Sequence, residues 1–259
     1  MVNNTKGIAQ RLQHLRQTGK KGLALLIDPE KSQNLDKLKN ITNIAQSGGA
    51  DFVFVGGSQV TEKNIDLTIE TIKNECKEIP VLLFPGHVNQ VSKAADGILF
   101  ISLISGRNPE FLIGQHVAAA PLLAKSKLEI LPTGYMLVDG GSLTSVHYLS
   151  QTVPLPNDKP TLAVATALAG SFLGLQYLFM DAGSGAKNPV SQKLIKGVKN
   201  NTHCPLIVGG GIDSVDKAKK AWSAGADLVV MGNGVEKSPD LLTGALDYLH
   251  LYNLSLHVN

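Results

Sequence analysis

Short apolar runs alternate with longer amphipathic segments along most of the chain. The run GLALLID at residues 22–28 precedes a helix-like segment near residues 35–46, and the run at residues 51–55 precedes another at residues 62–75. Further apolar runs lie at residues 80–84, 97–102, 128–137, 177–180, 205–208 and 227–231. Runs of Val, Ile and Leu without alternating polar residues are typical of parallel strands that are buried on both faces.

The spacing of these runs predicts a closed barrel. Helical segments are expected at residues 161–175, 188–199, 214–224 and 239–250. A strand–helix alternation that recurs about eight times in roughly 250 residues has the size of one barrel. A doubly wound sheet would need a GxGxxG sequence after its first strand, where this chain has Asp28-Pro29-Glu30-Lys31. We therefore predict an α/β fold, a single (β/α)₈ TIM-barrel domain over residues 1–259, with the long loop at residues 140–160 as a candidate lid.

Composition and charge exclude several classes of protein. The 24 basic and 21 acidic residues give a net charge of +3 without a clustered basic face, so no nucleic-acid partner is expected. The two cysteines lie far apart and have no metal-ligand spacing. No apolar run reaches the roughly 18 residues that a membrane span requires, and the N-terminus lacks the apolar segment of a secretory signal. These features predict a cytoplasmic protein without a transmembrane segment.

Glycine-rich sequences follow the last two predicted strands. They are GGGI at residues 209–212 and GNG at residues 232–234. Consecutive glycines let backbone N–H groups approach an anion, and the loops after strands 7 and 8 of barrels often bind phosphate. Either sequence alone could form a tight turn only. Their occurrence after both strands predicts a phosphate site.

A third glycine-rich loop, DAGSGA, follows strand 6 and could close the same phosphate site. Its Ser184 hydroxyl and its backbone amides are candidate phosphate ligands. Asp181 lies at the strand end, where a carboxylate beside a substrate hydroxyl could act as a general base. The alternative role for Asp181 is to cap the following helix.

Carboxylate and hydroxyl groups also follow the first two strands. Asp28 follows strand 1, and Gly56-Gly57-Ser58 follows strand 2. Asp28 and Ser58 are candidate ligands for Mg²⁺, which takes few protein ligands and leaves room for phosphate oxygens. Ordinary loop capping is the alternative. Lys31 and Arg107 are candidates for contacting further phosphate charge, or for a purely surface role.

Eight ordered sequences together carry a family resemblance: LLIDPEK, FVGGS, SLISGRNPEFLIGQH, LPTGYMLVDGG, the stretch at residues 159–174, FMDAGSGA, IVGGGI and MGNG. Over residues 7–250 the chain resembles geranylgeranylglyceryl phosphate synthase, and it is most similar to the second branch of that family, which includes bacterial members. The resemblance implies a barrel prenyltransferase. Its reaction would join sn-glycerol 1-phosphate, through the 3-hydroxyl, to geranylgeranyl diphosphate, releasing diphosphate in ether phospholipid biosynthesis.

The resemblance also implies residue roles and an assembly. Asp181 would be the catalytic base, Asp28 and Ser58 would hold the Mg²⁺ cofactor, and the chain would form at least a homodimer. The residues implied to bind the glycerol phosphate are Phe179, Met180, Asp181, Ala182, Gly183, Ser184, Gly185, Gly210, Gly211, Gly232 and Asn233.

Two positions depart from the family pattern. The family usually has YLEAGSG where this chain has FMDAGSG, so Phe179 and Asp181 replace Tyr and Glu. Phe179 lacks a hydroxyl that could bond the glycerol phosphate. Asp181 is one methylene shorter, so its carboxylate must reach the glycerol hydroxyl through a backbone shift or through water. A displacement of about 1 Å can cost on the order of a hundredfold in rate.

Three alternatives remain open from the sequence. The same chemistry with a longer donor, such as heptaprenyl diphosphate, fits the same residues. A different phosphate-binding barrel enzyme, such as a phosphosugar isomerase or epimerase or a flavin enzyme, would fit the glycine loops but does not explain Asp28-Pro29 with Gly56-Gly57-Ser58. A barrel that binds a phosphorylated ligand without catalysis is suggested by the changes at Phe179 and Asp181.

Overall fold

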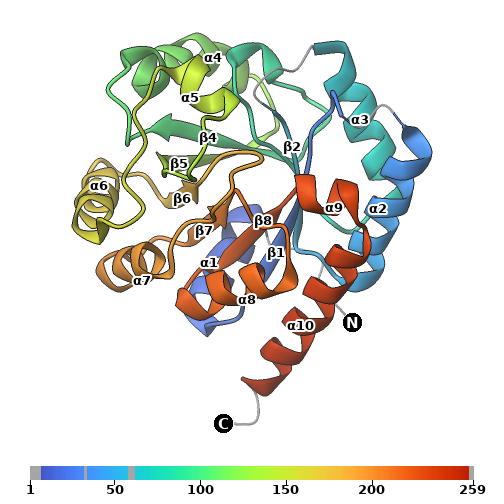
Figure 1. The fold of residues 1–259 in the computed structure, drawn as a ribbon. Coiled ribbons are helices and arrows are strands. Elements are labelled where there is room, and N and C mark those ends of the chain that lie inside the picture. The colour runs from blue at the N-terminus through green and yellow to red at the C-terminus, as the bar shows by residue number, and fades with distance from the viewer. Residues whose placement is uncertain (1–6, 32–33, 58–61, 257–259) are drawn as a thin grey trace.

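Eight parallel strands close into a barrel in the computed structural model, which describes residues 7–31, 34–57 and 62–256 (Figure 1). Neighbours in the barrel are neighbours in the sequence, and β8 pairs with β1. The predicted barrel is therefore confirmed. The strands are β1 (Gly22–Ile27), β2 (Phe52–Val55), β3 (Val81–Leu83), β4 (Gly97–Leu103), β5 (Glu129–Leu137), β6 (Tyr177–Asp181), β7 (Leu206–Gly209) and β8 (Leu228–Met231).

Helices surround the barrel and close its base. They are α1 (Ile8–Thr18), α2 (Leu35–Gly48), α3 (Glu62–Glu75), α4 (Gln115–Leu123), α5 (Ser145–Ser150), α6 (Pro160–Phe172), α7 (Gln192–Asn201), α8 (Val215–Ala224), α9 (Asn233–Lys237) and α10 (Asp240–Ser255). A 3₁₀ turn, η1 (Val88–Gln90), and a π-helical turn, η2 (Glu110–Gly114), complete the described elements. No helix within these described parts of the chain is both long and apolar enough to cross a membrane.

The structure departs from regular strand–helix alternation between β3 and β4. This connection, residues 84–96, is described throughout and contains only η1 where a barrel helix was expected. The segment at residues 140–160 also differs from the expected loop, because it contains α5. Thr144 and His147 form a capping box at the first turn of α5. The sequence pattern missed α5 because six residues are too few for a helical period to appear.

The base of the barrel is closed by α1, which the sequence pattern did not predict. Its buried residues are Ile8, Leu12 and Leu15. Glu129, the first residue of β5, accepts hydrogen bonds from the N–H groups of Ile8 and Ala9 at 2.8 Å each. In Figure 1 this helix is seen behind β8. Apolar side chains of α1 thus cover the N-terminal ends of the strands and join the core inside the barrel.

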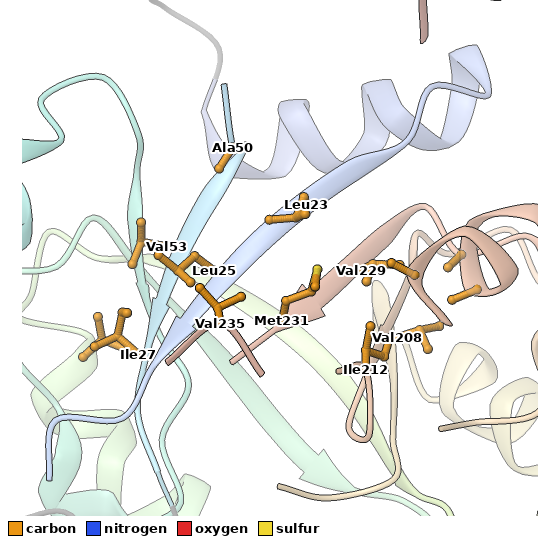
Figure 2. Packing of buried hydrophobic residues seen from close by; sticks show 14 of the residues in the cluster. Leu23, Leu25, Ile27, Ala50, Val53, Val208, Ile212, Val229, Met231 and Val235 are labelled. Carbon is orange, nitrogen blue, oxygen red and sulfur yellow. The ribbon is translucent and has the colours of Figure 1, made fainter. Parts of the chain in front are cut away.

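Strand side chains alternate between two cores. On β1, Leu23, Leu25 and Ile27 belong to the core between strands and helices; Figure 2 shows them spread along β1, with Met231 and Val235 in the same cluster. On β6, Leu178 and Met180 join this outer core, whereas Tyr177 and Phe179 belong to the core inside the barrel. Asp181 has the same parity as Phe179, so it too faces the barrel interior.

Candidate active site

A cavity of about 560 Å³ opens at the C-terminal ends of the strands, a size typical of small-molecule sites. Its rim is polar and is formed by the loops after β1, β2, β6, β7 and β8. Its deeper part is apolar and includes Ile98 and Phe100 on the outer side of β4 as well as Leu99 and Ile101 on the inner side. The cavity therefore reaches past β4, on the side where η1 stands in place of a helix.

The glycine loops after β6 and β7 lie against each other. Gly183, Gly185, Gly210 and Gly211 all have φ between +67° and +89°, a region that favours glycine. A Cβ atom on Gly210 would lie 2.6 Å from the backbone nitrogens of both Ala182 and Gly183. Only glycine allows this approach, and Gly210 itself lines the cavity.

Not every residue expected to bind the glycerol phosphate reaches the cavity. Phe179, Asp181, Ser184, Gly185, Gly210, Gly211, Gly232 and Asn233 line it, and Met180, Ala182 and Gly183 do not. Met180 points into the outer core because it has the opposite parity to its neighbours. The N–H of Ala182 donates to the Gly209 carbonyl at 3.2 Å, so this amide is engaged within the protein.

Asp181 combines burial with two hydrogen bonds from neutral donors. The residue is 8% exposed. The Tyr135 hydroxyl donates to Oδ2 at 2.7 Å, and the Gly183 N–H donates to Oδ1 at 2.8 Å. Burial raises the pKa of the Asp181 carboxyl above its ordinary value, and both hydrogen bonds and nearby His147 lower it in part. The result is a fixed carboxylate with increased proton affinity that faces a ligand cavity.

Tyr135 supplies a hydroxyl near the position where Phe179 lacks one. It is paired with Phe179 across β5 and β6, and it reaches upward to Asp181, two residues further along. The Tyr135 and Phe179 rings contact edge to face at 5.5 Å, and Phe84 stacks on Phe179 at 5.1 Å. No local motif links Tyr135 to Asp181, so the sequence alone does not indicate this contact.

A second polar cluster joins the loops after β1, β6 and β8. The Lys31 ammonium lies 3.1 Å from Asp28 Oδ2 and also donates to Asn233 Oδ1 at 3.1 Å. The Asn233 amide in turn donates to Ser184 Oγ at 2.8 Å. Glu236 of α9 lies beside this cluster. Burial and then nearby Asp28 raise the pKa of Glu236, whereas Lys31 lowers it.

The described part of the expected metal site fits magnesium in its chemistry. Asp28 offers a partly exposed carboxylate at the cavity rim, and such hard oxygen ligands suit Mg²⁺. Ser58, the second expected ligand, lies outside the described residues. Of the two further phosphate candidates, Lys31 lines the cavity. Arg107 does not: its guanidinium donates to the Gly106 carbonyl at 2.6 Å and the residue is exposed.

The apolar arm of the cavity contains a histidine. The His116 ring packs edge-on against Phe100 with centroids 4.5 Å apart, and burial lowers its pKa. A neutral imidazole is compatible with the apolar residues that line the same cavity, among them Val88, Val91 and Ala119. Val146 and Leu149 of α5 also line the cavity, so the segment expected as a lid does border the site.

The chain matches the PcrB family over residues 16–248. It is 50% identical over 245 residues to the geranylgeranylglyceryl phosphate synthase of Spirosoma linguale, with 95% of this chain and 98% of that protein covered. It is 36% identical over 230 residues to the geranylgeranylglyceryl phosphate synthase of Korarchaeum cryptofilum, with 89% of this chain and 93% of that protein covered.

Solved structures agree with these matches. The chain is similar to the (S)-3-O-geranylgeranylglyceryl phosphate synthase of Thermoplasma acidophilum in complex with the substrate sn-glycerol-1-phosphate. The TM-score is 0.88 at 30% identity, with 95% of this chain and 99% of that one covered. Thiamine phosphate pyrophosphorylase from Pyrococcus furiosus, 15% identical with a TM-score of 0.58, shares the fold alone. The resemblance in the sequence is confirmed, and the chain belongs to the PcrB family.

Proposed function

We propose that this protein transfers a geranylgeranyl group from geranylgeranyl diphosphate to the 3-hydroxyl of sn-glycerol 1-phosphate. The single observation that carries the chemistry is the buried Asp181 carboxylate, held by Tyr135 beside the glycine loops. The names of the similar proteins support the same reaction. The sn-glycerol-1-phosphate in the Thermoplasma acidophilum complex supports this molecule as the acceptor.

The acceptor's phosphate would bind where the loops after β6, β7 and β8 meet. Ser184, Gly185, Gly210, Gly211 and Asn233 line this part of the cavity. Backbone N–H groups of such loops bind an anion without introducing a second charge. The amide of Gly183 serves Asp181 instead, so this loop both binds phosphate and orients the base.

Asp181 would take the proton as the glycerol 3-hydroxyl attacks C1 of the donor. The new C–O bond forms on C1 while the bond from C1 to the diphosphate oxygen breaks, and the electron pair leaves with the diphosphate. Burial favours this step because it raises the proton affinity of the carboxylate. The Tyr135 hydrogen bond prevents the short Asp side chain from turning away from the acceptor.

The donor would lie across the cavity from the acceptor, with its tail in the apolar arm. Asp28 and Ser58 would hold magnesium, which when bound neutralises charge on the departing diphosphate. Rings of Phe84, Phe179 and Tyr135 line the cavity between the two ends. Their faces can stabilise positive charge that develops on the prenyl carbon.

The test is an assay with purified protein, sn-glycerol 1-phosphate, labelled geranylgeranyl diphosphate and Mg²⁺. We expect an ether-linked product. Treatment with a phosphatase should therefore not release a free prenyl alcohol from it. Parallel reactions with farnesyl and heptaprenyl diphosphate measure the donor preference. Binding of glycerol 1-phosphate without any prenylated product would contradict the proposal and would support a binding barrel. Isomerisation of a phosphosugar would support a different barrel enzyme.

A further inference from the structure

Lys31 contacts residues of two different loops at the rim of the cavity. Its ammonium lies 3.1 Å from Asp28 Oδ2 on its own loop and 3.1 Å from Asn233 Oδ1 on the loop after β8. The side chain is 47% exposed and that of Asp28 is 20% exposed, so solvent reaches the pair from the cavity. Lys31 therefore connects the carboxylate expected to hold metal with the loop expected to hold phosphate.

A divalent cation and this ammonium would compete for the same carboxylate. Oδ1 of Asp28 already accepts a hydrogen bond from the Glu30 N–H at 3.2 Å, and Oδ2 faces Lys31. A metal ion bound directly to Oδ2 would bring two like charges within a few ångströms of each other. Coulomb repulsion at such distances favours a shift of the more flexible group, and a lysine side chain can move at little cost.

The second contact of Lys31 indicates where the ammonium goes. Asn233 bonds Ser184, and both residues line the part of the cavity between the glycine loops. An ammonium released from Asp28 but still close to Asn233 lies within reach of an anion held by these loops. Phosphate oxygens are preferred partners for such a mobile point charge.

We propose that Lys31 is an exchangeable counter-ion: it neutralises Asp28 until a divalent cation binds there, and it then contacts phosphate oxygens of the bound substrates. This inference rests on the proposed function for the identity of those phosphates. It makes Lys31 a binding residue of the reaction and couples metal binding to phosphate binding at the mouth of the barrel.

The inference has two parts, the exchange of Lys31 for a cation at Asp28 and the contact of Lys31 with phosphate. Removal of the lysine charge tests them separately. The variant Lys31→Met retains the length of the side chain and loses the charge, and Lys31→Arg retains the charge. Lys39→Met is the matched control, because Lys39 lies 4.0 Å from Glu75 between α2 and α3 and does not line the cavity. Calorimetric titration of each full-length protein with Mn²⁺ in the absence of substrates measures the cation affinity directly.

We expect Lys31→Met to bind Mn²⁺ about five-fold more tightly than the wild-type protein, whereas Lys31→Arg and Lys39→Met bind it as the wild type does. In a second titration, with Mg²⁺ present, Lys31→Met should bind sn-glycerol 1-phosphate about five- to tenfold more weakly. Unchanged or weaker Mn²⁺ binding by Lys31→Met would overturn the exchange, as would a wild-type protein that binds no Mn²⁺. Unchanged glycerol phosphate affinity would overturn the second contact.

These outcomes are distinguishable from failure of the proposed function. The Mn²⁺ titrations contain no substrate, so tighter binding by Lys31→Met supports the exchange even if no ether product forms. Absence of ether product from the wild-type protein would refute the prenyl transfer alone. Normal ether formation together with unchanged Mn²⁺ affinity in Lys31→Met would leave the function intact and refute the role of Lys31.

Discussion

The barrel has a buried carboxylate near each end, and the two have opposite surroundings. At the mouth, Asp181 ends β6 and accepts hydrogen bonds from two neutral donors, the Tyr135 hydroxyl and the Gly183 N–H. At the base, Asp227 precedes β8, and its side chain is 1% exposed. It is paired with the Lys199 ammonium, lies 3.8 Å from the Arg16 guanidinium and accepts from the Leu206 N–H at 2.8 Å.

This difference separates a reactive group from a structural one. Neutral donors orient Asp181 without cancelling its charge, so burial keeps its pKa raised and its proton affinity high. The base surrounds one carboxylate with cations, and burial there lowers the pKa of Lys199 as well as that of neighbouring Lys21, the latter to about 8. The ion pairs of Asp227 at the base do not line the cavity at the mouth, so their effect is on stability.

The sharpest test of the comparison is Asp181→Asn. The amide oxygen can still accept from the Gly183 N–H, and the amide nitrogen can donate to the Tyr135 hydroxyl oxygen, so the fold should persist, but the amide cannot take a proton. We expect kcat to fall about a thousandfold, within the range for loss of a general base. Single-turnover ether formation measures this. Asp139→Asn is the control, because exposed Asp139 also accepts from the N–H two residues ahead, at 2.8 Å from Gly141. Full kcat in Asp181→Asn would remove Asp181 as the base.

The equivalent change at the base, Asp227→Asn, should affect stability and leave the site unchanged. Lys199 and Arg16 would lose their shared counter-charge, so we expect a loss of about 3 kcal/mol in the free energy of unfolding. Urea denaturation measures the loss, and the affinity for glycerol 1-phosphate should not change in the folded protein. Asp216→Asn is the matched control, since its ion pair with Lys220 is exposed and should contribute below about 1 kcal/mol. Equal effects of both variants would contradict the contrast.

A pair of glycine substitutions extends the comparison to the backbone. Gly210 at the mouth and Gly19 after α1 both have positive φ, +79° and +73°. Nothing lies within 4 Å of a Cβ on Gly19, whereas a Cβ on Gly210 would collide with Asp181 and the loop after β6. Gly19→Ala should cost about 1 kcal/mol of stability and no binding. Gly210→Ala should weaken glycerol 1-phosphate binding on the order of a hundredfold by calorimetry. Comparable affinities in the two variants would show that the loops do not bind the phosphate.

Tyr135→Phe should give the smallest effect and the most specific one. The Tyr135 hydrogen bond lowers the pKa of Asp181 against the effect of burial, so its loss should raise that pKa further. A base works only when ionised, and activity falls as the pH drops through its pKa. The acid limb of the kcat/KM profile should therefore move to higher pH, with about a tenfold loss near that limb. Tyr177→Phe, which alters the buried tyrosine of β6, should leave the limb unchanged. A profile of Tyr135→Phe that matches the wild type would refute the positioning role.

Local sequence features predicted more of the rim than of the interior. The glycines after β6 to β8, and Asp28 and Asp181 at strand ends, were identified because each lies beside a strand that the sequence already indicates. Met180 was included among the expected binding residues only because it lies within the FMDAGSG motif. Alternation along β6 places Phe179 and Asp181 on one face and Met180 on the other, and this signal was present in the sequence.

The sequence by itself determined the class of fold, the order of the strands and the chemistry available at each loop, because runs, turns and glycines act over a few residues. Only the tertiary structure decided which groups meet. Tyr135 reaches Asp181 across 46 residues, and Lys31 reaches Asn233 across 202. Such contacts depend on strand register and on closure of β8 against β1, which no local pattern encodes. The same holds for two other features. The helix α1 covers the base of the assembled barrel, and the connection after β3 has only η1 where a helix was expected, which leaves that side of β4 open to the cavity.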